Sequence, residues 1–335
     1  MKAAVIRLPA TLDSLAIEER TEPAVEAGKV KVRWHALSLN FHDYAVAAGL
    51  MPTAEGRIPI SDGAGEIVEV GSGVSEWKRG DKVMSLFFPD WQDGPPTFET
   101  TRRLGGDSTD GCAVEFSVID PCTLTPIPQN YSYAEASTLP CAALTAWRAL
   151  VEIGQIKAGD KVLVEGTGGV SIFALQLAKA FGATVYATSS SPAKLERLRQ
   201  LGADHVIDYR ADAQWGDTVN ALSNGGVDHV IDVGGAATLG QSIAAVRVDG
   251  SVVLIGILGG MQAEINLAQW MIKQQHIRPV AVGSRAMQNN MVRFLEKSAI
   301  KPVIDTRFQL GKLADAFRYQ LSGHHFGKIV IDVAA

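Results

Sequence analysis

A glycine-rich turn between a predicted strand and a predicted helix constrains this fold more than any other feature of the chain. The turn lies in Val162-Leu-Val-Glu-Gly166-Thr-Gly168-Gly169-Val170-Ser171, which runs directly into an apolar stretch that begins at Ile172. A strand before the glycines and a helix after them are the context in which Gly-x-Gly-Gly indicates a dinucleotide site. Gly166 permits the tight turn, and Gly168 lets the backbone approach a pyrophosphate at the helix N-terminus. We therefore predict a dinucleotide site here, against the alternative of an ordinary glycine-rich connection.

Apolar runs and helical stretches alternate on both sides of this turn. In chain order we expect strand 161–165, helix 169–181, strand 184–188, helix 192–201, strand 205–208, helix 212–223, strand 227–233, helix 236–247 and strand 251–257. Continuous Val, Ile and Leu runs separated by helices are typical of a parallel sheet that is covered on both faces. The fold class is therefore α/β, with a doubly wound parallel sheet of the Rossmann type in residues 124–261.

The first part of the chain follows a different pattern, in which Gly, Pro and Asp separate short β-like segments. We expect strands at 2–7, 29–39, 63–70, 81–87 and 112–118, which indicate a compact, mostly antiparallel β domain over residues 1–123. Three prolines between Pro121 and Pro128 predict a connector, because proline continues neither a strand nor a helix. An Ala-rich stretch then predicts a buried helix at 134–153. Later we expect helices at 286–300 and 311–321 and a last strand at 328–333.

Composition excludes several classes of partner. Lys and Arg number 31 against 36 Asp and Glu, a net charge of −5, and no basic run occurs, so nucleic acid and membrane surfaces are poor partners. No apolar stretch reaches the roughly 20 residues of a bilayer span, and the N-terminus becomes charged too early for a secretory signal. The 3 cysteines show no paired spacing. We expect a cytoplasmic protein that binds neither nucleic acid nor membranes.

The end of the strand at 184–188 bears on the choice between NAD(H) and NADP(H). NAD sites place an Asp or Glu about 20 residues after the glycines, where it accepts hydrogen bonds from the ribose. This chain has Ser189-Ser190-Ser191-Pro192-Ala193-Lys194 there, so hydroxyls and an ammonium can hold a 2′-phosphate and no acid repels it. Tyr209 is expected to close over the adenine. We predict NADP(H) in preference to NAD(H); the alternative is that the serines only cap the helix that begins at Pro192.

Along nearly its whole length the chain resembles the medium-chain dehydrogenase/reductases. The segments that carry the resemblance are Ala36–Asp43, Ser61–Gly71, Arg79–Val83, Leu139–Ala146, Gly166–Val170 and Gly327–Val330. The resemblance implies a GroES-like catalytic domain at 1–123, completed by 262–335, together with the Rossmann domain at 124–261. It also implies hydride transfer, a small-molecule substrate and a homodimer, for which the apolar strands at 252–258 and 280–282 are candidates. Expected cofactor contacts are Thr145, Thr167, Gly168, Gly169, Val170, Gly234, Ile255, Gly256 and Lys328; burial in a helix is the alternative for Thr145.

The chain departs from the zinc members of that family at the metal ligands. Those members hold a catalytic metal with a Cys, a His-Glu pair and a second Cys. Here the first position is Asn40, the pair becomes Ser61-Asp62, and Cys141 alone remains. The lobe that carries four cysteines and a structural zinc in the family has none between Phe87 and Cys112. Because a catalytic zinc needs three protein ligands, we predict no zinc. A rebuilt site from His42, Asp62 and Cys141 is the alternative.

Without a metal, hydrogen-bond donors must polarise the substrate oxygen. His42 stands where the zinc enzymes carry the Ser or Thr of their proton relay, and an imidazole titrates near neutrality. Asp43 is expected to orient a side chain or to tie down the loop, and a structural ion pair is the alternative. Asn40 either donates to a substrate oxygen or braces the backbone. Asn40, His42 and Asp43 are therefore the candidate catalytic residues, with a loop histidine as the alternative for His42.

The sequence defines the substrate less closely than the cofactor. Large side chains that are candidates for an apolar pocket are Phe41, Met51, Trp91 and Phe98. Met51 stands where enoyl reductases of the family carry a Tyr, so an enoyl reductase is less favoured than the other activities. The sequence thus predicts a zinc-independent, NAD(P)-dependent oxidoreductase acting on a carbonyl or alcohol, a quinone or an activated alkene. The alternatives are a non-catalytic NADP-binding regulatory or structural protein and a zinc alcohol dehydrogenase with atypical ligands.

Overall fold

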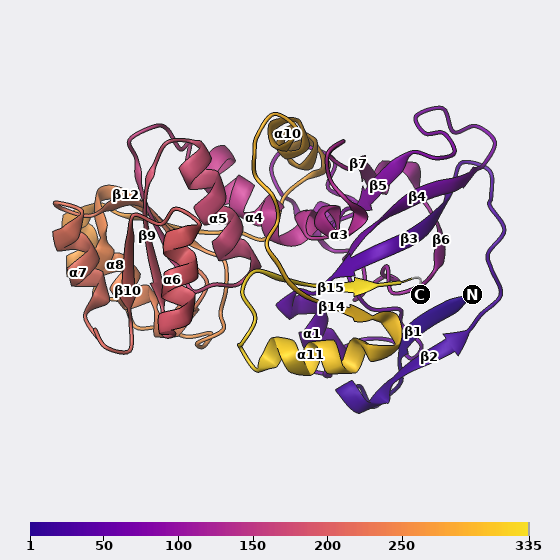
Figure 1. The fold of residues 1–335 in the computed structure, drawn as a ribbon, viewed down its shortest axis with the longest axis horizontal. Helices are drawn as coiled ribbons and strands as arrows, with labels where there is room; N and C mark the ends of the chain where they lie inside the picture. The colour runs from indigo at the N-terminus through magenta and orange to yellow at the C-terminus, as the bar shows by residue number, and fades with distance from the viewer. Residues whose placement is uncertain (334–335) are drawn as a thin grey trace. The chain divides into compact units, whose positions relative to one another are not determined.

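The chain folds into two compact units in a computed structural model that describes residues 1–333 (Figure 1). Unit 1 comprises Met1–Leu144 and Val282–Ala335, and unit 2 comprises Thr145–Ala281. The boundaries predicted after residues 123 and 261 both come earlier than these. The shift has a physical reason at each end, because residues 124–126 and 276–279 form strands that complete the sheets of unit 1 and unit 2.

Unit 2 is built on a parallel six-stranded sheet with the order β10-β9-β8-β11-β12-β13. Its strands are β8 (Lys161–Glu165), β9 (Thr184–Ser189), β10 (His205–Asp208), β11 (Val227–Asp232), β12 (Val246–Leu254) and β13 (His276–Pro279). The chain runs outward from β8 in one direction and from β11 in the other. This order is that of the doubly wound Rossmann fold, which confirms the predicted class. Because β12 ends at Leu254 and has neighbours on both sides, residues 252–254 have no free edge for pairing across a two-fold axis, contrary to expectation.

Helices cover both faces of this sheet, α5 and α6 on one and α7 and α8 on the other (Figure 1). The helices of unit 2 are η4 (Arg148–Ile153), α5 (Gly169–Ala180), α6 (Pro192–Gln200), α7 (Trp215–Leu222), η5 (Gly235–Ala237), α8 (Leu239–Ala245) and α9 (Leu267–Lys273). Leu163, Val230 and Val252 from the strands pack with Trp215 and Val219 of α7 in one buried cluster. No helix in residues 1–333 is long and apolar enough to cross a bilayer.

Unit 1 contains a seven-stranded sheet whose path is β14-β15-β3-β4-β5-β7, with β6 paired to β3, and a separate pair β1-β2. The strands are β1 (Lys2–Ile6), β2 (Leu15–Glu19), β3 (Val30–Ser38), β4 (Asp62–Val70), β5 (Lys82–Ser85), β6 (Phe116–Ile119), β7 (Leu124–Pro126), β14 (Ile304–Gln309) and β15 (Lys328–Asp332). Among these described strands, β14 and β15 pair in parallel and the other pairs are antiparallel. Since β15 pairs with β3, the end of the chain completes this unit.

The helices of unit 1 hold two corrections to the predicted elements. They are η1 (Leu12–Ser14), α1 (Phe41–Ala47), α2 (Phe98–Thr101), η2 (Pro121–Thr123), α3 (Tyr133–Ala136), η3 (Leu139–Ala143), α10 (Arg285–Leu295), η6 (Leu310–Lys312) and α11 (Leu313–Leu321), and α4 (Leu144–Trp147) lies at the boundary with unit 2. The predicted helix 134–153 is four short pieces, two of them π-helical, because Pro140 lacks the N–H that a continuous helix needs. The predicted connector contains β7, an outer strand where proline is tolerated.

Candidate active site

The glycine turn after β8 has the geometry of a phosphate cradle. Gly166 has a φ of +69°, a conformation that glycine adopts without strain. Gly168 is the N-cap of α5 and supplies no side-chain cap, so the first N–H groups of this helix remain available to an anion. A Cβ atom built on Gly166 or Gly168 would meet no atom within 4 Å, so open space faces both glycines. Residues Thr167 to Val170 therefore fit a dinucleotide pyrophosphate.

A second loop at the same edge of the sheet follows β11. The carboxylate of Asp232 accepts hydrogen bonds from the N–H groups of Gly234 and Gly235, at 3.1 and 2.9 Å, and shapes this loop. The N–H of Ile255 donates to the carbonyl of Asp232 at 2.8 Å. A Cβ on Gly256 would lie 2.1 Å from the carbonyl oxygen of Val233, so only glycine fits there. The structure thus gathers Gly234, Ile255 and Gly256 beyond the carboxyl ends of neighbouring strands, where Rossmann folds bind nucleotides.

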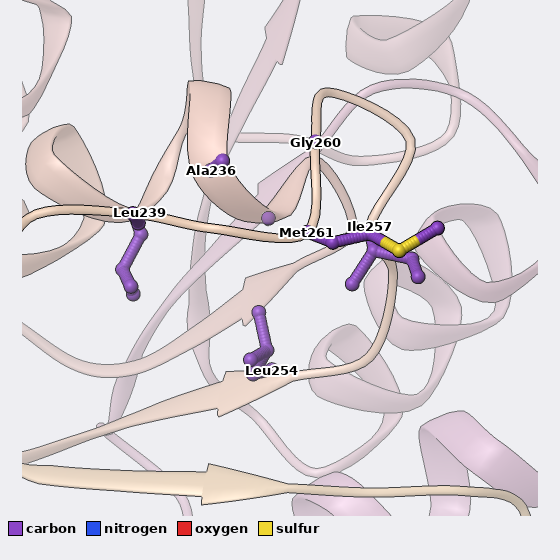
Figure 2. Close-up of a pocket in the computed structure, with 8 residues that line it drawn as sticks. Ala236, Leu239, Leu254, Ile257, Gly260 and Met261 are labelled. Carbon is purple, nitrogen blue, oxygen red and sulfur yellow. The ribbon is translucent and has the colours of Figure 1, made fainter.

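A small apolar pocket lies next to this second loop (Figure 2). It has a volume of about 160 Å³ and is lined by Gly235, Ala236, Leu239, Leu254, Ile257, Gly260, Met261 and Ala263. An enclosed cavity of about 150 Å³ holds one benzene ring, so this pocket has room for a small apolar group. None of these residues was predicted to bind a ligand. The available signal was the cluster of apolar residues directly after a predicted buried strand.

The residues predicted to hold a 2′-phosphate lie at the ends of β9 and β10. Ser189 is the last residue of β9; its hydroxyl accepts the N–H of Ser191 at 3.4 Å and its carbonyl accepts the N–H of Tyr209 at 3.2 Å. Ser191 is the N-cap of α6 but makes no side-chain capping bond, so helix capping does not occupy its hydroxyl. Lys194 lies in the first turn of α6, and Tyr209 is 42% exposed. No carboxylate stands at the end of β9.

In unit 1, the start of α1 carries the three predicted catalytic residues. Asn40 is the N-cap, and the buried carboxylate of Asp43 accepts the N–H of Asn40 at 2.8 Å. Its second oxygen accepts the N–H of Ser61 at 2.9 Å. Asp43 therefore ties the start of α1 to the segment before β4. Of the roles expected for Asp43, these hydrogen bonds correspond to tying down the loop.

His42, the second residue of α1, lies beside this arrangement. Its Nε2 is 3.6 Å from Oδ2 of Asp107 and has no hydrogen-bond partner in residues 1–333. The ring of Phe87 meets the imidazole edge-on, with 5.5 Å between ring centroids. Burial lowers the pKa of His42, so the imidazole is neutral at pH 7 and accepts a proton through a free nitrogen. The structure therefore places His42 in a helix with a largely buried side chain, and not in an exposed loop.

A buried chain of hydrogen bonds connects the positions where the zinc enzymes carry their ligands. The ammonium of Lys328, the first residue of β15, donates to the carbonyl of Leu39 and to Oδ1 of Asn40, both at 2.6 Å. The amide of Asn40 then donates to the hydroxyl of Ser61 at 3.2 Å, and that hydroxyl donates to Asp62 at 2.9 Å. We call these residues (Asn40, Ser61, Asp62 and Lys328) the lysine network.

The lysine network is fully enclosed. Lys328 and Asn40 are 4% and 8% exposed, and Asp62 is 0% exposed. The second carboxylate oxygen of Asp62 accepts the backbone N–H of Cys141 at 3.2 Å. Burial raises the pKa of Asp43 and of Asp62 to about 6, and the ammonium of Lys328 opposes this rise in both. The ammonium therefore serves as the counter-charge for two buried acids. Lys328 was predicted as a cofactor contact, and the structure shows two of its three N–H donors directed at protein atoms.

Comparison with known proteins agrees with this geometry. Residues 26–129 match the alcohol dehydrogenase GroES-like domain, and residues 169–297 match the zinc-binding dehydrogenase family. The chain is 42% identical to a zinc-type alcohol dehydrogenase-like protein of Schizosaccharomyces pombe, over 96% of each chain. The chain belongs to the medium-chain dehydrogenase/reductase superfamily. It is thus an oxidoreductase of the alcohol dehydrogenase-like kind, as the sequence predicts.

Two solved structures of this superfamily share the whole architecture. An NAD-dependent alcohol dehydrogenase superposes with a TM-score of 0.92 at 30% identity, and the match covers 100% of both chains. The crotonyl-CoA carboxylase/reductase AntE, in complex with NADP, superposes with a TM-score of 0.87 at 26% identity, over 99% of this chain and 94% of that chain. Members that resemble this protein therefore include one described with each nucleotide.

The superfamily's zinc does not fit the residues of this member. Within residues 1–333, no three His, Cys, Asp or Glu side chains are grouped to hold a metal ion. The amide oxygen of Asn40 already accepts the ammonium of Lys328, which would also repel a cation bound beside it. His42 faces Asp107, so the structure does not assemble the rebuilt site expected from His42, Asp62 and Cys141. The donor set is an amide, a hydroxyl and one carboxylate around an ammonium, which is unlike a zinc site.

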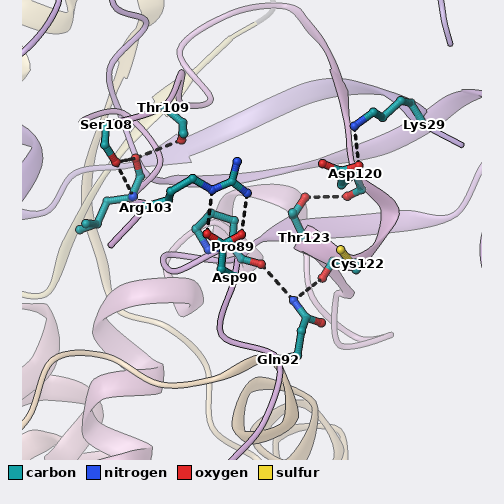
Figure 3. A network of polar contacts seen from close by, with 11 residues as sticks. Lys29, Pro89, Asp90, Gln92, Arg103, Ser108, Thr109, Asp120, Cys122 and Thr123 are labelled. Carbon is teal, nitrogen blue, oxygen red and sulfur yellow. Dashed lines mark hydrogen bonds and ion pairs between the residues drawn. The ribbon is translucent and has the colours of Figure 1, made fainter. Parts of the chain in front are cut away.

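The lobe that carries the structural zinc elsewhere in the superfamily is held here by polar contacts (Figure 3). Arg103 makes a bidentate pair with Asp90, with N–O distances of 2.7 and 2.6 Å. The amide of Gln92 donates to the carbonyls of Pro89 and Cys122, at 2.9 and 3.1 Å, and so connects this loop to η2. These hydrogen bonds therefore crosslink the loop, both within itself and to η2.

The structure does not support the predicted apolar substrate pocket in unit 1. Trp91 is 0% exposed and its indole N–H donates to the carbonyl of Gly94. Met51 packs against the core of unit 1. Phe98 and Phe41, by contrast, are 75% and 46% exposed. These side chains are not gathered around one cavity, because size alone does not distinguish core, surface and pocket residues. Thr145, a predicted nicotinamide contact, lies buried in α4 at the start of unit 2.

Proposed function

We propose that this protein is a zinc-independent oxidoreductase that prefers NADP(H) and transfers hydride between the nicotinamide and a carbonyl or alcohol, a quinone or an activated alkene. The observation that carries zinc independence is the lysine network, in which an ammonium and its hydrogen bonds occupy the positions of the metal ligands. An enzyme of this kind polarises the substrate oxygen with hydrogen-bond donors and needs no Lewis acid.

The nucleotide, when bound, supplies the hydride chemistry. The glycine turn after β8 binds its phosphates, and the loop after β11 forms the neighbouring wall. His42 moves the proton that accompanies the hydride. As a neutral imidazole it accepts the proton of an alcohol, and in the opposite direction the imidazolium returns the proton to a carbonyl oxygen. Asp43 positions the start of α1, and with it His42, through the N–H groups of Asn40 and Ser61.

The preference for NADP(H) rests on the charge at the end of β9. A 2′-phosphate there meets the hydroxyls of Ser189 and Ser190 and the ammonium of Lys194, and meets no carboxylate from β9. An NAD-specific site needs an acid at this point. The relatives include one described with each nucleotide, so the residues of this chain carry the assignment.

We also propose a cytoplasmic homodimer. The chain has only 3 cysteines, without paired spacing, and this composition suits a reducing compartment. The edge strand β13 has β12 on one side only, and Met271 and Ile272 of the nearby α9 are 75% and 77% exposed. A second copy pairing along β13 would cover unpaired backbone and apolar side chains together. Light scattering of the purified protein measures this directly, and a monomeric mass would contradict it.

The test of the proposed function combines metal analysis with a substrate panel. We expect well under one zinc per chain, and oxidation of NADPH by at least one of the quinones, enals, ketones or aldehydes offered. This turnover is expected to survive prolonged treatment with a chelator. Zinc at one per chain that is lost together with activity would support the zinc enzyme with atypical ligands. Nucleotide binding without turnover on any member of the panel would support the non-catalytic protein.

A further inference from the structure

Two buried carboxyl groups lie beneath the two loops that we assign to the nucleotide. Glu165 is the last residue of β8 and Asp232 is the last residue of the neighbouring strand β11. They are 3% and 0% exposed. Ser242 of α8 lies between them, with its Oγ 2.6 Å from Oε1 of Glu165 and 2.8 Å from Oδ2 of Asp232. One hydroxyl therefore bridges two acids in the interior of unit 2.

Two ionised carboxylates and one serine hydroxyl share a single proton, whereas two hydrogen bonds between them require two protons. A hydroxyl donates one hydrogen bond and accepts the others, so Ser242 donates to one carboxyl only. Both contacts, at 2.6 and 2.8 Å, are within hydrogen-bonding distance, and a contact without a proton would press the lone pairs of two buried oxygens together. That proton must come from the other carboxyl group, which then donates to Ser242. One of the two acids is protonated.

The surroundings identify Glu165 as the protonated acid. Asp232 also receives the N–H groups of Gly234 and Gly235 and the hydroxyl of Thr238, at 3.1, 2.9 and 2.7 Å, and these three donors stabilise an anion. Oε2 of Glu165, by contrast, is buried and has no hydrogen-bond partner within residues 1–333. Burial, and then the charge of Asp232, raise the pKa of Glu165 to about 8.

We propose that Glu165 is a positioning residue whose proton joins the two nucleotide-binding loops through Ser242, and that nucleotide affinity falls when this proton is lost. The proposal rests on the nucleotide site assigned above. Its structural basis is that each acid anchors one loop. The carbonyl of Glu165 accepts the hydroxyl of Ser171 in the first turn of α5, at 2.6 Å, while the carboxylate of Asp232 holds the loop after β11.

If Glu165 loses this proton, two adjacent carboxylates lie beneath the site that binds the anionic pyrophosphate. The groups that face Glu165 are Asp232 and the N–H of Val233 from the β11 side, and the hydroxyls of Thr238 and Ser242 from the η5–α8 side. Asp232 is the titratable group among them, and it repels an ionised Glu165. The repulsion is relieved when the loops separate, which removes the cradle for the pyrophosphate.

The first test measures the dissociation constant of NADPH by fluorescence from about pH 6 to about pH 9. In the wild type we expect constant affinity at the acidic end and, above the ionisation of Glu165, a loss that approaches about tenfold per pH unit. Glu165→Gln, which is permanently neutral, is expected to remove this added pH dependence. Glu196→Gln, on the exposed side of α6, is the matched control and should follow the wild type. Parallel curves for wild type and Glu165→Gln would overturn the proposal.

The second test needs no nucleotide. Infrared difference spectra of wild type against Glu165→Gln should show the C=O band of a protonated carboxyl at about pH 7 and its loss at about pH 9. Ser242→Ala retains both acids without their bridge and should move the midpoint of that loss. Absence of the band at pH 7, or an unmoved midpoint, would overturn the shared proton. If the band is present and no nucleotide binds at any pH, the coupling fails together with the proposed function, and the shared proton remains established.

Discussion

At the scale of single residues, His42 carries the clearest catalytic prediction. Its neutral imidazole lies in unit 1 with Nε2 free of hydrogen bonds, whereas the glycine turn for the nucleotide lies in unit 2. His42→Ala should lower kcat by roughly 10²–10⁴-fold, because general acid–base catalysis contributes about that factor. Nucleotide affinity should stay almost unchanged, because the glycine turn lies in the other unit. Steady-state kinetics and nucleotide titration measure the two quantities.

The control for His42 is the exposed His324 of the same unit, whose replacement by Ala should change neither quantity. The lowered pKa of His42 gives a further check. In the direction of alcohol oxidation, activity should rise with pH through a midpoint below the usual value of about 6.5, because the neutral ring is the base. A His42→Ala enzyme within twofold of wild type would make this residue a structural one.

Ser189 decides the nucleotide at the same scale. Ser189→Asp places a carboxylate at the end of β9, against a 2′-phosphate and within reach of ribose hydroxyls. Lys194→Ala removes the opposing charge. Because a hydrogen bond to a charged group contributes about 1.5–3 kcal/mol, each change should weaken NADPH by roughly 10- to 100-fold while NADH is little affected or improved. Dissociation constants for both nucleotides measure this. Preference of the wild type for NADH would contradict the assignment.

At the scale of elements, the lysine network joins β15, the start of α1 and the start of β4. Lys328→Met removes the cation from a site that buries Asp43 and Asp62, and removing one partner of a buried charged group costs about 3–5 kcal/mol. We expect a loss of that order in the free energy of unfolding of unit 1, measured by denaturant titration. Lys312→Met, at an exposed lysine, should be neutral.

A double variant separates the charge effect from lost packing. If Lys328 serves as the counter-charge, Asp62→Asn should recover part of the stability that Lys328→Met loses, because one uncompensated acid is gone. Additive losses in the double variant would mean that the lysine contributes through packing alone.

The same elements show how far the sequence determines the fold. Periodicity gives β8, β9, β10 and β11 to within one residue at each end, since buried parallel strands are mostly apolar. It places the start of β12 five residues late and does not predict β13. It misses β7, whose prolines are tolerated in an outer strand, and α1, whose helix is only 7 residues long. Asn40, Ser61 and Asp62 are found from motif positions. The role of Lys328 is not, because it meets Asn40 across a separation of 288 residues, which local patterns do not report.

At the scale of the whole molecule, the buried acids of the two units differ in pKa. In unit 1, burial raises the pKa of Asp43 and Asp62 to about 6. In unit 2, burial and Asp232 raise the pKa of Glu165 to about 8. Carboxyl groups of the unfolded chain have pKa values of about 4. Above that pH each folded unit therefore binds more protons than its unfolded chain, over a limited pH window. The window ends near pH 6 for unit 1 and near pH 8 for unit 2.

The sign of the resulting pH dependence follows from this proton excess. A group whose pKa is raised in the folded state stabilises less as pH increases, so these acids should lower the stability of each unit across its window, by up to about 1.4 kcal/mol per pH unit for each proton. Hydrogen exchange measured peptide by peptide reports the two units separately. Between about pH 6 and pH 8 we expect protection to fall in the strands of unit 2, with Glu165→Gln removing that fall, while Asp62→Asn acts only on unit 1 and only below about pH 6. Protection in unit 2 that increases over this range, or that Glu165→Gln does not alter, would show that Glu165 is ionised in the folded protein.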